Sequence, residues 1–290
     1  MPESDPILGI CFSGKRLLYA VAEPGADAEV LQVGCIDYSF DVVEASVNQN
    51  SEMFSGILNA IKRLKNDYGF HDIRILTPPA QECWSVLPKT VYDEKDERDA
   101  HLQALTHGMK DQPADPVWFT VSNRDFKMVA LRNQPYLDSL AKLTENTIRS
   151  RYFSDFEIGS VWIDHSHSTG SFLTVSCHKN LISISSFILG KLRAATYITF
   201  DDIHDLPYFW LQNMEHLTWL NGLYDQILVY GYESYKVIEM LQPFWEDNAE
   251  ILNMDSLDKM RVQADEKTYS FHLEEAFPAI MMALGAPNQD

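Results

Sequence analysis

Basic residues are scarce in this chain of 290 residues. Lys and Arg together number 23 against 42 Asp and Glu, which gives a formal net charge of -19 at pH 7. A surface of this sign repels nucleic acids, which proteins bind by releasing counterions from phosphates. We therefore expect no nucleic-acid partner, and the acid excess is interpreted as solvated surface.

Cysteine is also sparse, and no two cysteines form a Cys-x-x-Cys pair. This spacing predicts buried thiols in a reducing compartment. The acidic start of the chain, Met1–Asp5, lacks the basic and apolar segments of a signal peptide, and no run approaches the roughly 18 apolar residues of a membrane span. We expect a cytoplasmic protein without a membrane span. The four cysteines are Cys11, Cys35, Cys83 and Cys177.

Two motifs of common hydrolases are missing as well. The chain contains neither a Gly-x-Ser-x-Gly elbow nor a Walker phosphate loop. A serine hydrolase triad or a P-loop nucleotidase would need one of them. The sequence therefore assigns no catalytic residue.

Each half of the chain contains a predicted hairpin, in which a buried strand leads through a polar turn into a returning strand. A hydrophobic content of 46% is enough to bury a core around both. The hairpins are Ile7–Phe12, Ser13–Lys15 and Leu17–Ala22, then Val161–Asp164, residues 165–170 and Phe172–Val175.

The elements after each hairpin predict an α/β protein with two similar lobes. Three antiparallel strands followed by helices and parallel strands are typical of ribonuclease-H-like sheets, whereas a Rossmann domain begins with strand, glycine-rich loop and helix. We expect a first lobe at 1–155, with a small α+β insert at about 81–151, and a second at 156–290. The last helix is expected to end at Gly285 and to be able to pack back on the first lobe.

Three motifs carry a resemblance to known proteins: Val86–Lys95, Tyr197–Asp202 and Tyr230–Glu233. With the repeated hairpin, they make the chain similar to the actin-like ATPase superfamily, which includes the pilus protein PilM and the division protein FtsA. The likeness is closer to an uncharacterised bacterial family of actin-like proteins without an established activity. It implies two lobes that hold ATP and magnesium between them.

The resemblance implies a phosphate-binding turn at the first hairpin. Ser13 and Gly14 can present N–H groups to an anion, and Lys15 can pair with phosphate. Nucleotide-hydrolysing relatives have an Asp just before this turn that helps to hold Mg²⁺. Cys11 stands there instead, and a thiol is a poor ligand for a hard cation.

The resemblance also implies a second phosphate-binding turn, with Asp164 as its carboxylate. Ser168, Thr169 and Gly170 would contact phosphate in that turn. Adenosine-binding relatives have two adjacent glycines at the purine slot, where this chain has Gly231 followed by the bulky Tyr232.

These departures predict a catalytically degenerate actin-like protein that serves as a protein-binding or assembly platform, with the cleft or the insert as its docking surface. The alternative is a nucleotide-dependent switch or weak ATPase that uses the turn residues above. The partner's identity and the choice between monomer and homodimer stay open.

Two sets of residues have the composition of a metal site, one rich in histidine and one rich in aspartate. His165, His167 and His178 with Asp164 could hold zinc, but they are interpreted as loop or edge residues. Residues 201–205, with three Asp and one His, are interpreted as a helix N-terminus capped by Asp205, so no resident metal is expected.

Overall fold

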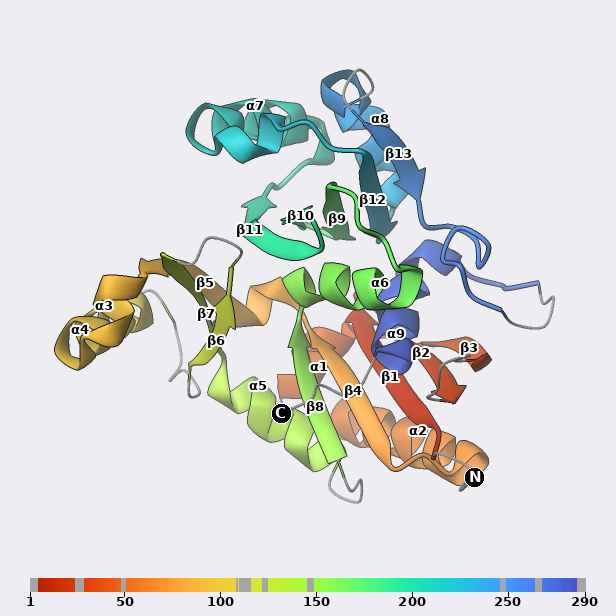
Figure 1. Ribbon diagram of the computed structural model, residues 1–290. Helices are drawn as coiled ribbons and strands as arrows, with labels where there is room; N and C mark the ends of the chain where they lie inside the picture. Colours follow the sequence, from red (N-terminus) through yellow and green to blue (C-terminus); the bar gives the residue numbers. More distant parts are fainter. Residues whose placement is uncertain are drawn as a thin grey trace.

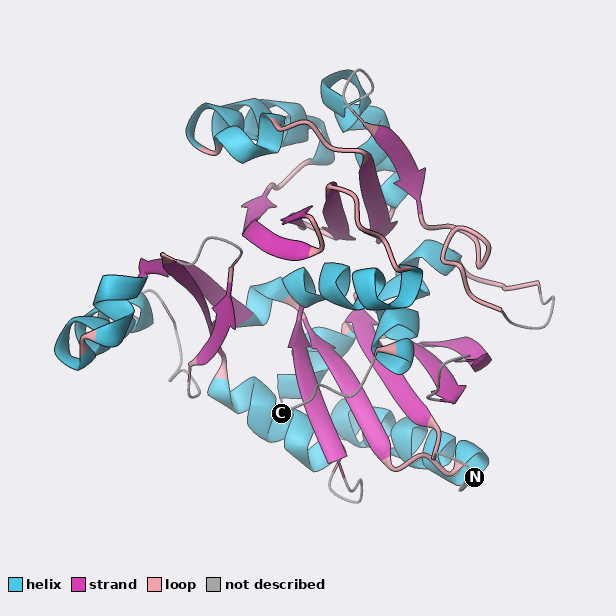
Figure 2. Cartoon of the chain, viewed as in Figure 1, coloured by secondary structure: helices cyan, strands magenta, loops and turns pink. Residues whose placement is uncertain are grey.

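The computed structural model describes residues 5–23, 29–47, 51–107, 109, 116–121, 125–144, 149–245, 249–263 and 268–285. Residues 1–4 of the acidic N-terminus lie outside this part. Two five-stranded mixed sheets and one three-stranded sheet organise the chain, with helices between and around them (Figures 1 and 2).

The first sheet has the strand order β3-β2-β1-β4-β8. Strands β1, β2 and β3 form an antiparallel meander, and β4 and β8 run parallel to β1. The bounds are β1 Ile7–Ser13, β2 Arg16–Glu23, β3 Glu29–Asp37, β4 Asp72–Thr77 and β8 Arg149–Ser154.

The second sheet repeats this plan in the order β11-β10-β9-β12-β13. Its first three strands are antiparallel neighbours, and β12 and β13 run parallel to β9. The predicted α/β class with mixed sheets is thus confirmed. The bounds are β9 Phe172–His178, β10 Leu181–Ile188, β11 Lys191–Thr199, β12 Gln226–Gly231 and β13 Glu250–Asn253.

One predicted strand is wrong: Val161–Asp164 belongs to helix α6, Ile158–Ser166. A capping box starts the turn before this helix, in which Ser154 and Glu157 exchange side-chain and backbone hydrogen bonds. The helix then buries Ile158 and Trp162, which are four residues apart. The second hairpin therefore consists of β9 and β10, with its turn at residues 179–180.

Helices cover both sheets and also fill the space between them (Figure 1). α1, α2 and α5 share a core with one face of the first sheet, and α7 packs with α8 on the outer face of the second. α6 and α9 lie between the sheets (Figure 1). The bounds are α1 Val42–Val47, α2 Glu52–Tyr68, α5 Gln134–Leu143, α7 Leu206–His216, α8 Ser234–Trp245 and α9 Leu273–Leu284.

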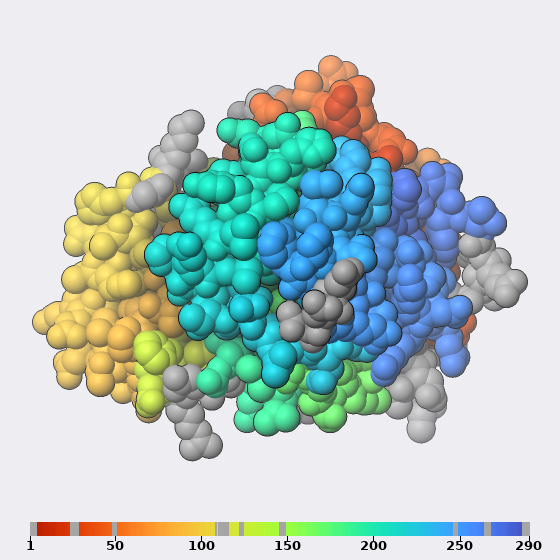
Figure 3. Space-filling view, turned by 90° about the horizontal axis from the view of Figure 1, so that it is seen from above, coloured from red at the N-terminus to blue at the C-terminus, as the bar shows by residue number. Residues whose placement is uncertain are grey.

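The three-stranded sheet has the order β5-β7-β6 and carries two short helices on one face. It projects at the side of the molecule, where its yellow residues flank the cyan and blue second half of the chain (Figure 3). Its opposite face meets the second sheet through Trp84 of β5, whose ring lies 5.5 Å from that of Tyr197 on β11. The bounds are β5 Glu82–Pro88, α3 Lys89–Asp93, α4 Lys95–Thr106, β6 Val117–Thr120 and β7 Phe126–Arg132.

Helix α9 is fixed closely against the first sheet. Gly9 of β1 lies so near the backbone of α9 that a Cβ there would collide with the carbonyl oxygen of Ala279. At the other end, the buried Arg74 of β4 donates to the carbonyl oxygens of Met282 (3.0 Å) and Gly285. A cation at this position complements the negative end of the helix dipole. Among the described helices, none is both long and apolar enough to cross a bilayer.

Candidate functional site

A cavity of about 1180 Å³ opens where the parallel strands of both sheets end. Ligands of open α/β sheets bind in crevices at such carboxyl ends. Its walls are the β1–β2 turn, the β9–β10 turn, the loop after β4, the residues after β12, and the first turns of α1 and α9. We take this cavity as the candidate functional site.

The first turn contributes the predicted residues Ser13, Gly14 and Lys15 to this cavity. Gly14 has φ 56°, which a glycine adopts at little cost. Its carbonyl oxygen accepts a hydrogen bond from the Val42 amide at 2.7 Å, and that of Lys15 accepts one from the Tyr38 amide at 2.8 Å. The backbone of the turn is thereby fixed, and the Lys15 side chain is exposed.

The second turn contributes His178, Lys179 and Asn180 to the cavity, and none of the three was predicted as a phosphate-turn residue. The sequence did contain a signal for this turn, because the strand-like runs around Val175 and Ile184 leave only a short polar segment between them. The turn is fixed by the Phe200 amide, which donates to the Asn180 carbonyl oxygen at 3.1 Å.

The structure does not bring the other predicted residues of the second hairpin to this cavity. Asp164 is on α6, and Ser168, Thr169 and Gly170 precede β9. The cavity is at the opposite end of β9, which at about 3.3 Å per residue is about 20 Å away. Gly170 instead approaches Asp225, whose carboxylate accepts a hydrogen bond from the Ser171 amide at 2.7 Å.

Gly231 lies at the end of β12, close to the backbone of β9. It has φ 99°, and a Cβ there would collide with the Cys177 carbonyl oxygen. Glycine at this position therefore allows β12 to approach β9 closely. The next two residues, Tyr232 and Glu233, line the cavity.

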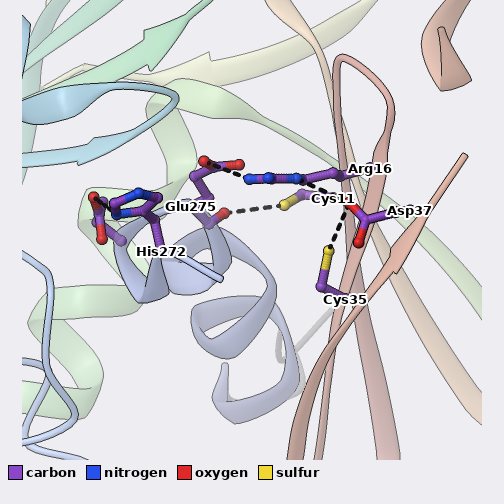
Figure 4. Close-up of polar contacts among 7 residues, drawn as sticks. Cys11, Arg16, Cys35, Asp37, His272 and Glu275 are labelled. Carbon is purple, nitrogen blue, oxygen red and sulfur yellow. Dashed lines mark hydrogen bonds and ion pairs between the residues drawn. The ribbon is translucent and has the colours of Figure 1, made fainter. Parts of the chain in front are cut away.

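Cys11 lies beneath α9, with only 4% of its surface exposed. Its Sγ is 3.6 Å from the carbonyl oxygen of Glu275 (Figure 4). Burial raises the pKa of this thiol well above its usual value, and the Glu275 carboxylate adds to the effect. Cys11 is therefore a neutral, covered side chain.

The two hairpins can be compared from their last strand pairs, Ser13 with Arg16 and His178 with Leu181. Cys11 is two residues before the first of these pairs, and Ser176 is two residues before the second. The carboxylate expected before each turn is therefore replaced by a thiol in one hairpin and by a hydroxyl in the other.

Glu275 at the start of α9 crosses to the β1–β2 hairpin and lines the cavity. Its Oε1 is 2.9 Å from Nη1 of Arg16, and Arg16 also donates to Asp37 at 3.1 Å (Figure 4). Burial raises the pKa of Glu275, and the Arg16 charge opposes this effect. The ion pair joins the C-terminal helix to the first turn.

His178 is held from below by Asp155, which follows β8. Asp155 Oδ2 is 2.9 Å from His178 Nε2, and the Asp155 side chain is fully buried. The Ser176 hydroxyl lies 3.3 Å from the same nitrogen. Because both contacts involve Nε2, these residues do not form a relay from serine through the imidazole to the carboxylate.

The zinc alternative is not supported by the positions of its histidines. His165 is on α6, and its Nε2 is 3.1 Å from the Met260 carbonyl oxygen. His178, in contrast, is at the end of β9. Among the described residues, no three His, Cys, Asp or Glu side chains converge as metal ligands. The 201–205 segment does precede helix α7, and Asp205 occupies the N-cap position of that helix without a capping hydrogen bond from its side chain. Asp202 caps the short 3-10 turn before it by accepting from the His204 amide at 2.9 Å.

Neither a scan against protein-family models nor a search of curated proteins gave a match. Solved structures do match. A Bacteroides thetaiotaomicron protein of unknown function with an actin-like ATPase fold is 16% identical, with a TM-score of 0.52 over 89% of this chain and 95% of that one. A PilM-PilN type IV pilus biogenesis complex gives 11% identity and a TM-score of 0.63 over 96% and 97%.

A third match is the cytoplasmic domain of EpsL from the type II secretion system of Vibrio cholerae. It is 8% identical, with a TM-score of 0.52 over 96% of this chain and 94% of that one. Identities this low show the fold alone. The chain has the actin-like ATPase fold, as its sequence motifs indicated.

Proposed function

We propose that this protein is an actin-like protein which has lost magnesium-dependent nucleotide chemistry and acts as a binding or assembly platform for a protein partner. The burial of Cys11 under α9 carries the proposal. A hard cation such as Mg²⁺ needs oxygen ligands, and a neutral buried thiol offers none.

The second hairpin supports the same conclusion. Ser176 stands where a second carboxylate would be needed, and Asp164 is at the far end of β9. Of the acids that line the cavity, Glu275 is already paired with Arg16, and Glu233 with Lys236 at 2.6 Å. Asp41 and Glu44, which also line it, come from the start of α1 and not from either turn. The cavity thus offers no carboxylate pair from the two turns.

An exposed apolar surface formed by the insert and β11 supports the proposal of a protein partner. Val86 and Phe126 of the insert lie on the same face of the neighbouring strands β5 and β7 and are 45% and 37% exposed. Trp84 on that face contacts Tyr197 of β11, which is 36% exposed. Exposed apolar groups that cluster are typical of interaction surfaces. The fold neighbour PilM, seen in a complex with PilN, adds an example of this fold binding a protein. We propose this surface or the cavity as the docking site, in a cytoplasmic protein.

We further propose that the two five-stranded sheets belong to two lobes, residues 1–155 and 156–290. Their strand composition supports this division, since each sheet is made from one part of the chain. α9 then belongs by sequence to the second lobe while it packs on β1 and β2 of the first.

A second candidate function is a nucleotide-dependent switch or weak ATPase. It is favoured by the size of the cavity, about 1180 Å³, and by Ser13, Gly14 and Lys15 on its wall. Small-molecule sites are commonly of about 300 to 1,000 Å³.

Thermal unfolding with ATP, in magnesium and in excess chelator, tests the proposal. A ligand at about 100 times its Kd stabilises a protein by about 2.7 kcal/mol, which moves the melting temperature by several degrees. We expect magnesium to add no stabilisation. A magnesium-dependent shift that Lys15→Ala abolishes and Asp164→Ala leaves intact would support the switch instead.

A further inference from the structure

Helix α7, on the outer side of the second sheet, has two large side chains on its solvent-facing side. Its core side is complete without them, because Leu206 and Trp210 are fully buried and the Trp210 ring lies 5.5 Å from that of Trp245 on α8. Tyr208 and Leu211, one turn apart on the other side, are 65% and 50% exposed. The helix lies away from the first sheet, and the cyan residues around it form part of the open face in Figure 3 (Figures 1 and 3). The packing of the chain therefore does not account for these two exposed side chains.

A carboxylate lies one turn to either side of this pair. Asp205 precedes Tyr208 by three residues and Glu215 follows Leu211 by four, so the four side chains share one face of the helix. The Asp205 side chain accepts no capping bond, although it is at the N-cap position. Glu215 is in the last turn, where the negative end of the helix dipole disfavours a carboxylate. Within the described part of the chain, neither acid has an ion-pair partner.

The stretch of chain that contains α7 is acidic throughout. From residue 194 to residue 235 there is no Lys or Arg, and His204 and His216 are the only basic side chains. A surface that places apolar groups between unpaired carboxylates is complementary to a segment that places apolar groups between Lys or Arg. The exposed acids of this stretch are Asp201, Asp202, Asp205, Glu215 and Asp225.

The same charges disfavour the other occupants of an exposed apolar face. Carboxylates repel anionic lipid headgroups, which attract basic segments instead. A second copy of this chain, with its net charge of -19, would bring like charge to the contact. A basic segment of a different protein has the opposite charge and therefore fits this surface best.

We propose that the outer face of α7, formed by Asp205, Tyr208, Leu211 and Glu215, binds an amphipathic helix of a protein partner. The partner helix presents apolar side chains one turn apart, with Lys or Arg one turn before and one turn after them. Its apolar side chains have the spacing of Tyr208 and Leu211, so the two pairs bury each other while the charges set the orientation. This inference goes beyond the proposed function, whose docking site is the cavity or the surface of the insert and β11.

Titration with a synthetic helical peptide is the direct test. The peptide has two Leu three positions apart and a Lys one turn before and one turn after them, and a control peptide has Glu in place of each Lys. Anisotropy of the labelled peptides, at about 0.15 M salt, measures the Kd. We expect saturable binding of the Lys peptide and at least about tenfold weaker binding of the Glu peptide. Equal binding of the two peptides, or no saturation by the Lys peptide below about 1 mM, would overturn the proposal.

Apolar variants locate the contact on α7. Leu211→Gln should weaken the Lys peptide about fivefold to tenfold, because the Leu side chain is no longer available for burial. Met53→Gln is the matched control, since Met53 is on α2 and is 49% exposed. Its affinity for the peptide should stay within about twofold. Both positions are exposed, so folding should be unaffected, and circular dichroism checks this. Equal losses in the two variants would contradict the assignment.

Charge variants separate a local contact from attraction by the net charge. Glu215→Lys should weaken the Lys peptide about tenfold, with a smaller effect as salt is raised. Glu97→Lys on α4 changes the net charge by the same amount at another exposed position, and it should change the affinity by about twofold or less. Equal effects of the two reversals would show that the net charge alone attracts the peptide, which would overturn the proposal.

Two further measurements examine the rival occupants. Binding to vesicles of phosphatidylcholine and phosphatidylglycerol that Leu211→Gln abolishes would identify a lipid surface instead. A dimer in sedimentation experiments that Leu211→Gln dissociates would identify a second copy of the chain. Either result would overturn the proposal. Failure at α7 leaves the proposed function standing, because that is tested by the effect of magnesium on ATP binding.

Discussion

Arg16 on β2 and Glu275 on α9 form an ion pair of 2.9 Å although 259 positions separate them in the chain. The pair joins the start of the C-terminal helix to the first hairpin turn. Glu275 is 4% exposed, and its Oε2 has no hydrogen-bond partner in the described part of the chain. The Glu275 carboxylate is therefore buried with Arg16 as its ion-pair partner.

Arg16→Met should destabilise the protein by about 1 to 3 kcal/mol, because it leaves the Glu275 carboxylate buried without its cation. Chemical denaturation measures the change. Asp37→Asn is the control, since Asp37 is 76% exposed and its bond to Arg16 should contribute less than about 1 kcal/mol. If the double variant Arg16→Met, Glu275→Gln is no more stable than Arg16→Met, buried charge is not the cause.

Cys11→Asp should not restore magnesium binding. It would place a carboxylate beneath α9, next to the Glu275 carbonyl, where it lacks a cation. We expect a loss of about 3 kcal/mol or more in unfolding free energy. Cys11→Ala, which adds no charge, should cost distinctly less. A stable Asp variant that gains magnesium-dependent ATP binding would show that α9 does not close the site.

Gly9→Ala tests the close packing of α9 on β1. The added methyl would meet the Ala279 carbonyl oxygen and lie 2.6 Å from the Ala283 amide nitrogen, both of them backbone atoms. We expect a loss of about 1 to 3 kcal/mol. Gly56→Ala on α2 is the matched control, with nothing within 4 Å of its Cβ, and should be stabilising by about 0.5 to 1 kcal/mol. Equal effects on the melting temperature would contradict the packing argument.

Glu157 should make stability fall as pH rises through the weakly acidic range. Burial raises the pKa of this carboxyl from 4.5 to about 7, and its bond from the Ser154 amide opposes the shift. The folded state holds the proton more tightly than the unfolded state. The stabilisation is therefore complete below about pH 4.5 and is lost as pH approaches about 7.

Glu157→Gln, which stays neutral, should remove that part of the pH dependence. Unfolding free energies of both proteins across this range measure it, and the difference should reach about 3 kcal/mol at most. Burial lowers the pKa of His165, which acts in the opposite direction in both proteins and cancels in the difference. Parallel curves would show that Glu157 does not hold its proton.

Local sequence signals determined several elements. In α2, Phe54, Ile57, Ile61 and Leu64 recur at helical spacing and form one buried face. Ser51 caps this helix, and Gly69 ends it in the left-handed conformation. These features depend on neighbours in the chain, so the sequence suffices to find them.

Helix α6 shows where local signals fail. Val161, Trp162 and Ile163 have the β-branched and aromatic character of a strand, yet they are helical. Trp162 packs at 6.0 Å, ring to ring, on Phe277 of α9, a contact that the sequence does not reveal. This error displaced the second turn, so Asp164, Ser168, Thr169 and Gly170 were placed in the site and His178 was not.

The sequence by itself determined the fold class, the first turn with Gly14, and the thiol at Cys11, because residue type and strand or helix period are properties of a short segment. The tertiary structure decided that α9 covers Cys11, that Arg16 meets Glu275, and that Asp155 lies behind His178. Each of these pairs is brought together only by the packing of the sheets and helices around the cavity. Such contacts depend on the burial of the whole core, which no local pattern encodes.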